Sequence, residues 1–135
     1  MALITWEKRL ETGNARIDEQ HRALIDTFNK LHAAMKQGKG RDEIGPTLTF
    51  LKDYTIQHFK DEEGLMLASR YPHTHDHRRV HEDFVRKVDD VVTKFQAGQP
   101  VMTMQLMDFI EGWLVEHILG EDQRLGQHLA AKVLV

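Results

Sequence analysis

Apolar residues recur at intervals of three and four in four separate stretches of the chain. This spacing places them on one face of an α-helix. The stretches predict amphipathic helices over residues 17–35, 44–65, 77–95 and 102–117. The in-phase positions are Ile17, His21, Leu24, Phe28, Leu31 and Met35; Ile44, Leu48, Leu51, Thr55, His58, Glu62 and Leu65; His77, His81, Phe84, Val88, Val91 and Phe95; and Met102, Leu106, Phe109, Trp113 and His117.

Short breaks separate the four stretches. Gly38 and Gly40 form the first break, Tyr71-Pro72 the second, and residues 97–100 (Ala-Gly-Gln-Pro) the third. Because short connections join antiparallel neighbours, we predict an all-α, up-down-up-down four-helix bundle. Residues 1–16 lack the helical period and are expected to form an extended N-terminal arm, anchored by Trp6. Residues 1–135 are expected to form one domain.

Composition excludes several classes of function. The chain has 135 residues with 18 Lys and Arg against 21 Asp and Glu, so its net charge of -3 gives no electrostatic reason to expect a nucleic-acid partner. Apolar runs are too short for a membrane span, and with no cysteine the chain forms no disulfide and no thiolate metal site. We therefore expect a cytoplasmic, monomeric protein with no nucleic-acid partner and no membrane insertion.

The nine histidines are distributed unevenly, and several fall in phase with the apolar residues. Two pairs, His58/Glu62 and His77/His81, are four residues apart, which puts both side chains of each pair on one helix face. His21 and His117 occupy inward positions of the first and last helices.

Each of these residues has an alternative interpretation. A lone buried histidine is more often a hydrogen-bonded core residue than a ligand, and an i,i+4 pair is often only a helix-stabilising contact. These interpretations fail jointly, because five buried imidazoles and a carboxylate would each need a separate partner in one small bundle. A shared metal centre satisfies all of them, so we predict a metal site.

The number of ligands indicates the kind of site. Five histidines and two acids exceed the four ligands of a tetrahedral zinc, but they suit two octahedral ions with bridging carboxylates and one vacant position. Ferritin-like di-iron proteins use Glu-x-x-His motifs, and this chain has none.

Spacing alone leaves two ligand choices open. His73/His77 is an i,i+4 pair just as His77/His81 is. For the second acid, Glu121 lies four residues after His117, on the ligand face, whereas Asp122 lies about 140° away on an ideal helix. A local π-bulge, eased by Gly120, would bring Asp122 onto that face.

Four stretches of the chain resemble the hemerythrins, in particular their single-domain bacterial members. The matching stretches are Trp6 through Gly13 to IDEQH (17–21), HFKDEEGLM (58–66), YPHTHDHRRVHEDF (71–84) and WLVEHILGED (113–122). The resemblance covers essentially the whole chain and seven ligand positions.

The resemblance implies a centre of two non-heme iron ions. One iron would be held by His77, His81 and His117, and the other by His21 and His58, with one position open for O2. Glu62 and Asp122 would bridge the two ions together with an oxo or hydroxo group. On this basis we choose Asp122 over Glu121 and the His77/His81 pair over His73. Phe59, Trp113, Leu114 and Ile118 match positions that line the O2 pocket of the family.

The resemblance implies reversible O2 binding for storage, transfer or supply to an oxygen-using protein partner, without an enzymatic reaction. The alternatives are a di-iron redox enzyme (peroxidase, oxidase or nitric-oxide processing) and an O2 or redox sensor that acts through a separate partner. Both remain open because the sequence gives no O2 affinity.

The remaining histidines and the methionines of the last helix are assigned no ligand role. We interpret His73 and His75 as a solvated helix start, and His32 and His128 as surface or hydrogen-bonded helix residues. Three methionines of the last helix are expected to fill the core: Met102, Met104 and Met107.

Overall fold

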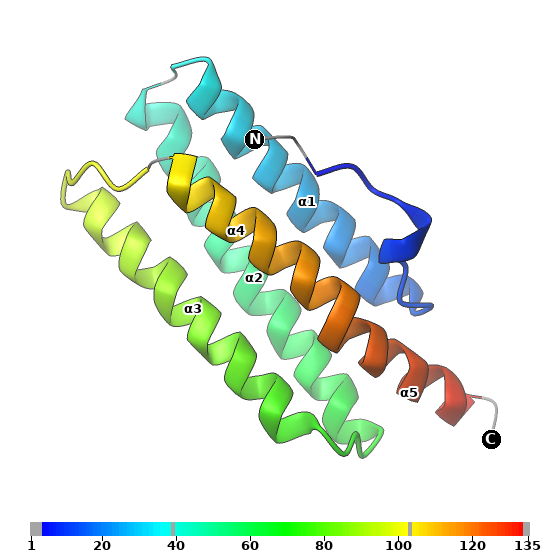
Figure 1. Ribbon diagram of the computed structural model, residues 1–135. Helices are drawn as coiled ribbons and strands as arrows, with labels where there is room; N and C mark the ends of the chain where they lie inside the picture. Colours follow the sequence, from blue (N-terminus) through cyan, green and yellow to red (C-terminus); the bar gives the residue numbers. More distant parts are fainter. Residues whose placement is uncertain (1–3, 39, 103, 134–135) are drawn as a thin grey trace.

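The computed structural model describes residues 4–38, 40–102 and 104–133, and every regular element among them is helical (Figure 1). The long helices are α1 (Ala15–Lys36), α2 (Arg41–Ala68) and α3 (Thr74–Gln96). The fourth consists of α4 (Met104–His117), the π-helical turn η2 (Ile118–Asp122) and α5 (Gln123–Val133). Consecutive helices run antiparallel in Figure 1, so the up-down-up-down four-helix bundle is confirmed.

The helices begin and end at capping residues and at the breaks between the apolar stretches. The side chain of Asn14 caps α1 by accepting a hydrogen bond from the Ile17 N–H at 3.0 Å. After α2 the chain turns through Arg70, whose φ is 57°, and the Tyr71 N–H donates to the Met66 carbonyl at 2.9 Å. Gly98, with a φ of 88°, follows α3 and takes a backbone conformation that side chains disfavour.

The N-terminal arm packs along the bundle as an extended segment with one 3-10 turn, η1 (Lys8–Leu10). Ile4 is tied to Asn29 of α1 by two hydrogen bonds of 3.1 and 2.8 Å. Trp6 packs against the main core, with the Arg22 guanidinium 4.6 Å from its ring. The arm and its anchor are therefore confirmed for residues 4–14, and residues 1–3 of the expected arm lie outside the described part. The expectation is wrong for Ala15 and Arg16, which form the start of α1 because Asn14 caps the helix.

The arm also meets the last helix at close range. A Cβ added to Gly126 of α5 would lie 2.2 Å from the Thr12 carbonyl oxygen, so only glycine allows this approach. The Thr12 N–H and hydroxyl both donate to Asp18 of α1, at 2.8 and 2.7 Å. These contacts fix the arm between the start of α1 and the segment that follows η2.

The residues on the inward face of α4 differ from the in-phase positions that the sequence predicts for this helix. Its buried residues are Met107, Ile110, Leu114 and His117, whereas Phe109 and Met104 are 37% and 39% exposed. Met107 fills the core as predicted and Met102 is half-buried, but the core placement of Met104 is wrong because it starts the helix on the outer face. Phe109 covers the bundle edge, beside Phe84. Among the described helices none is long and apolar enough to cross a membrane.

Candidate metal centre

Polar side chains from all four helices meet in one buried cluster toward the end of the bundle where α1 and α3 begin and α2 ends. Each is at most 5% exposed. They form two groups whose donor atoms lie within 4.8 Å of one another, and both groups share Glu62 and Asp122. The three-histidine group is Glu62, His77, His81, His117 and Asp122, and the two-histidine group is His21, His58, Glu62 and Asp122.

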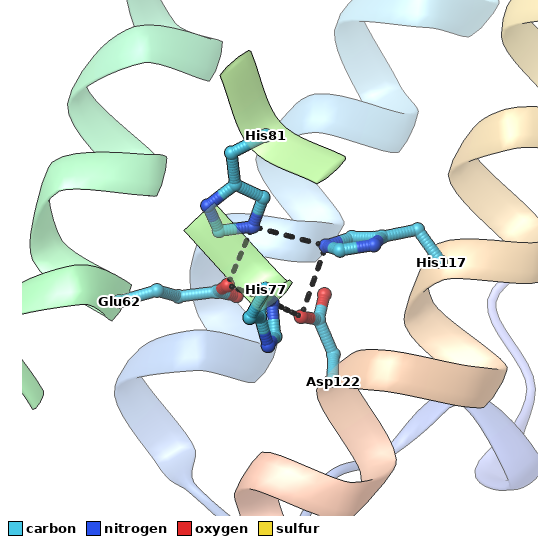
Figure 2. A group of neighbouring side chains, drawn as sticks. All are labelled: Glu62, His77, His81, His117 and Asp122. Atoms are coloured by element: carbon cyan, nitrogen blue, oxygen red, sulfur yellow. Dashed lines mark hydrogen bonds and ion pairs between the residues drawn. The ribbon is translucent and has the colours of Figure 1, made fainter. Parts of the chain in front are cut away.

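In the three-histidine group the Nε2 atoms converge on one oxygen of each carboxylate (Figure 2). Glu62 Oε1 lies 3.4 Å from His77 Nε2 and 3.3 Å from His81 Nε2. Asp122 Oδ1 lies 3.0 Å from His77 Nε2 and 3.2 Å from His117 Nε2. The His81 and His117 Nε2 atoms are 3.1 Å apart. The donor atoms therefore surround a single point.

In the two-histidine group the other oxygen of each carboxylate is used. Glu62 Oε2 lies 2.9 Å from His58 Nε2 and 3.4 Å from His21 Nε2. Asp122 Oδ2 lies 2.9 Å from His21 Nε2. Each carboxylate thus presents one oxygen to each group, which is the arrangement that a bridging carboxylate requires.

The cluster contains buried polar atoms that the protein leaves without hydrogen-bond partners. They include both carboxylate oxygens of Glu62 and Asp122 and the Nε2 atoms of His21, His58 and His77. Burying a polar group without a partner costs free energy, so such atoms are rare in folded proteins. Divalent cations coordinated by imidazole and carboxylate satisfy all of them, and the residues present fit a metal centre.

Without metal, the cluster binds protons in the place of cations. Burial lowers the pKa of His21 and His117, but the negatively charged carboxylates that face them outweigh it, raising these pKa values to about 9 and about 10. Burial raises the pKa values of Glu62 and Asp122, and the facing imidazoles more than offset this and hold both below their usual range. Metal binding must displace these protons.

The π-helical turn η2 directs Asp122 inward. Its extra residue per turn brings Asp122 under His117, while Glu121 is turned outward, with its Oε2 atom 3.6 Å from His117 Nδ1 and its side chain 30% exposed. The predicted π-bulge is confirmed. The turn does not need the glycine at position 120, because Gly120 has no positive φ and an added Cβ would meet nothing within 4 Å.

The structure separates the remaining histidines clearly. His73 and His75 are exposed and belong to neither group, as predicted. His128 is half-buried, and its Nε2–H donates to the Ser69 carbonyl oxygen at 2.9 Å, as expected of a hydrogen-bonded helix residue. The prediction for His32 is wrong: it is 1% exposed and neither ring nitrogen has a hydrogen-bond partner.

Two of the four residues expected to line an O2 pocket, Phe59 and Trp113, contact histidines of the cluster. Phe59, Leu114 and Ile118 are buried in the main core and Trp113 is half-buried. The Phe59 ring stacks on His81 at 3.7 Å between centroids, and Trp113 stacks on His117 at 4.5 Å. An apolar wall therefore flanks the ligands.

Two residues that contact the ligand histidines from outside were not predicted. Gln20 Oε1 lies 2.6 Å from His58 Nδ1, and Glu63 Oε2 lies 3.2 Å from His81 Nδ1. The only signal in the sequence was that each directly adjoins a predicted ligand, His21 or Glu62.

Comparison with known proteins identifies the family of the chain. Residues 12–129 match the family described as hemerythrin HHE cation binding domain. The chain belongs to the hemerythrin family. A bacteriohemerythrin of Stenotrophomonas maltophilia is 37% identical over 131 residues, covering 97% of this chain and 84% of the relative. A bacteriohemerythrin of Methylococcus capsulatus is 36% identical over 132 residues, covering 97% of this chain and all of the relative.

Solved hemerythrin structures share the fold. The wild-type crystal structure of a hemerythrin superposes with a TM-score of 0.89 at 36% identity, covering 95% of this chain and 98% of that chain. A structure described as an L114A mutant of a hemerythrin gives a TM-score of 0.90 at 35% identity, over 96% and 98% of the two chains. The hemerythrin resemblance predicted from the sequence is therefore confirmed.

Proposed function

We propose that this chain binds O2 reversibly at a non-heme di-iron centre and serves in oxygen storage, transfer or supply. Membership of the hemerythrin family and the buried His/Glu/Asp cluster support iron as the metal. The observation that carries the proposal is the unequal pair of ligand groups. One group offers five ligand residues and the other four, so an ion in the two-histidine group has a position left for an exogenous ligand.

In this proposal the ligands divide as the resemblance implies. His77, His81 and His117 would hold one iron, His21 and His58 would hold the other, and Glu62 and Asp122 would be shared by both. Iron bound here would supply the electrons that reversible O2 binding needs. Glu62 and Asp122, which face both groups through separate oxygens, support the bridging role.

The protein contributes a dry and proton-poor surrounding. The Phe59 ring stacks on His81 and also lies 5.9 Å from the ring of His58 in the two-histidine group, between centroids. Trp113 stacks on His117, and Leu114 and Ile118 belong to the same apolar core. None of the four side chains carries an acid or base. A wall of this kind excludes water and offers no proton to bound oxygen, which favours release over further reaction.

The test is anaerobic loading with Fe(II), iron counting, and visible spectra through repeated cycles of air and argon. We expect two irons per chain and a charge-transfer band that appears in air and fades under argon, in the wild type and in the exposed-histidine control His75→Ala. The variant His58→Ala should lose the band. Rapid, irreversible conversion to the ferric form with turnover of a reducing substrate would instead establish a redox enzyme. The cytoplasmic location, the monomeric state and an oxygen-using partner stay predictions.

A further inference from the structure

Gln20 connects two helices at the two-histidine group. It lies on α1 next to His21, and its side chain reaches α2, where its Oε1 atom is 2.6 Å from His58 Nδ1. Its Nε2 atom donates to Asp61 Oδ2 at 2.7 Å. One amide therefore spans from the outer nitrogen of a ligand histidine to a carboxylate one helical turn away.

These contacts determine which nitrogen of the neutral His58 ring carries the proton. A carboxylate only accepts hydrogen bonds, so Asp61 orients the Gln20 amide with its N–H toward Asp61 and its oxygen toward His58. The Gln20 oxygen in turn only accepts, which places the proton of His58 on Nδ1. The Nε2 lone pair of His58 is then free and points into the cluster, 2.9 Å from Glu62 Oε2.

Asp61 is itself held in place as a charged acceptor. Gln57 Nε2 donates to its Oδ1 at 3.2 Å, and an Arg16 nitrogen lies 3.2 Å from its Oδ2. The hydrogen bond from Gln20, together with these neighbours, keeps the pKa of Asp61 below its usual range. The orientation of Gln20 is thus set by a group that is ionised at neutral pH.

The outer nitrogens of the other ligand histidines differ in their surroundings, and those of His21 and His77 have no hydrogen-bond partner. A carboxylate lies behind two residues of the three-histidine group: Glu63 behind His81, at 3.2 Å, and Glu121 behind His117, at 3.6 Å. His58 has a neutral amide instead. A carboxylate acceptor raises the basicity of a ligand imidazole, so His81, whose Nδ1 is within hydrogen-bond distance of Glu63, is a stronger donor than His58.

We propose that Gln20 is a positioning residue that holds His58 in its metal-binding tautomer and, as a neutral acceptor, keeps the two-histidine ion the electron-poorer member of the pair. This inference rests on the proposed di-iron centre. Its consequence is that the ion with the open position resists oxidation to the ferric state more than it would with a carboxylate behind His58.

Removal of the acceptor tests the positioning role. Gln20→Leu keeps a similar side-chain volume but removes the hydrogen-bond acceptor of His58 Nδ1. In an anaerobic titration with Co(II), we expect the affinity for one of two ions to fall about 10- to 100-fold and the other to stay unchanged. Circular dichroism and thermal unfolding of the metal-free variant show whether the fold is kept. If both ions bind the folded variant with wild-type affinity, Gln20 does not position His58.

A charge exchange tests the electronic role while keeping the hydrogen bonds. In the double variant Gln20→Glu/Asp61→Asn, the new asparagine amide at position 61 donates to the new carboxylate at position 20. That carboxylate also accepts the hydrogen bond from His58 Nδ1, so His58 faces a charged acceptor instead of a neutral one. We expect the midpoint potential of the iron-loaded protein to fall and its autoxidation to accelerate. Glu63→Gln behind His81 is the matched opposite exchange and should raise the potential. A purely structural role leaves the potential of the double variant unchanged, which would overturn the inference.

Different results would overturn the di-iron centre and the role of Gln20. If the wild-type chain binds fewer than two Co(II) or Fe(II) ions, the proposed di-iron centre is wrong and the inference falls with it. If the wild type binds two ions and the Gln20 variants match it in affinity and potential, only the role of Gln20 is wrong.

Discussion

Asp122 Oδ1 lies 3.2 Å from His117 Nε2, although Asp122 comes five positions after His117 in the chain. On a regular α-helix such a spacing turns the second side chain well away from the first. The π-helical turn over Ile118–Asp122 accommodates the extra residue and places the carboxylate between both histidine groups. The local break in helical regularity therefore brings a second carboxylate to the position shared by both groups, where we propose that it bridges two ions.

This relationship distinguishes two neighbouring acids by experiment. Asp122→Ala removes a buried carboxylate that faces both groups, and we expect it to disrupt both metal sites. Glu121→Ala removes a partly exposed carboxylate that reaches only the outer nitrogen of His117, and we expect it to keep two irons per chain. Iron counting after anaerobic loading checks both variants. The opposite pattern would show that the regular i+4 geometry holds in solution.

His117→Ala should empty the three-histidine group. His117 Nε2 approaches both His81 Nε2 and Asp122 Oδ1, so its loss takes away one of three imidazoles that converge on the same point. We expect no more than one tightly bound iron per chain, with His75→Ala as the control that retains two. A variant lacking His117 that still binds two irons would refute the ligand assignment.

The metal-free protein should lose stability as the pH rises. The folded pKa values of His21 and His117, about 9 and about 10, lie above the ordinary value of 6.5. Their contribution to the free energy of unfolding is thus complete below about pH 6.5 and is lost as the pH passes 9 and 10. The lowered pKa values of Glu62 and Asp122 matter at acidic pH, where the free energy of unfolding falls as these carboxyls are protonated.

Urea unfolding of the metal-free chain at pH 6 and pH 9.5 measures this effect. We expect the free energy of unfolding to be lower at pH 9.5 by several kcal/mol, because two raised pKa values contribute. Zn(II)-loaded protein should not show this loss, since metal binding requires the deprotonated ligands. A metal-free protein whose stability is constant or increases over this range contradicts the charge arrangement described for the cluster.

His32 should be dispensable for metal binding and unfavourable for stability. It is buried beside Phe28 with no hydrogen-bond partner for either ring nitrogen. Replacement of an unsatisfied buried polar group by an apolar one of similar size is stabilising, so His32→Leu should raise the free energy of unfolding by about 1–3 kcal/mol. Thermal unfolding and iron counting check this together. Lower stability or lost iron would reveal a role for His32 that the structure does not explain.

The pattern of apolar positions was sufficient to predict the four helices, because amphipathic spacing and short connections restrict a chain of this length to few arrangements. The in-phase positions of His58, Glu62 and His81 likewise predicted which polar residues come together. Phe109 and Met104 were misplaced because the rotation of α4 is set by its packing against the other helices. The burial of His32 and the contacts of Gln20 also depend on helix pairs that no local pattern specifies.

The central claim is that two metal ions share Glu62 and Asp122 in one buried cluster. A crystal structure of the Fe(II)-loaded chain, with anomalous scattering recorded at the iron edge, tests it most directly. We expect two iron peaks per chain, one bonded to three histidines (His77, His81 and His117) and the other to two (His21 and His58), with both carboxylates spanning them. A single peak, or a second ion bound by Glu121 in place of Asp122, would contradict the account.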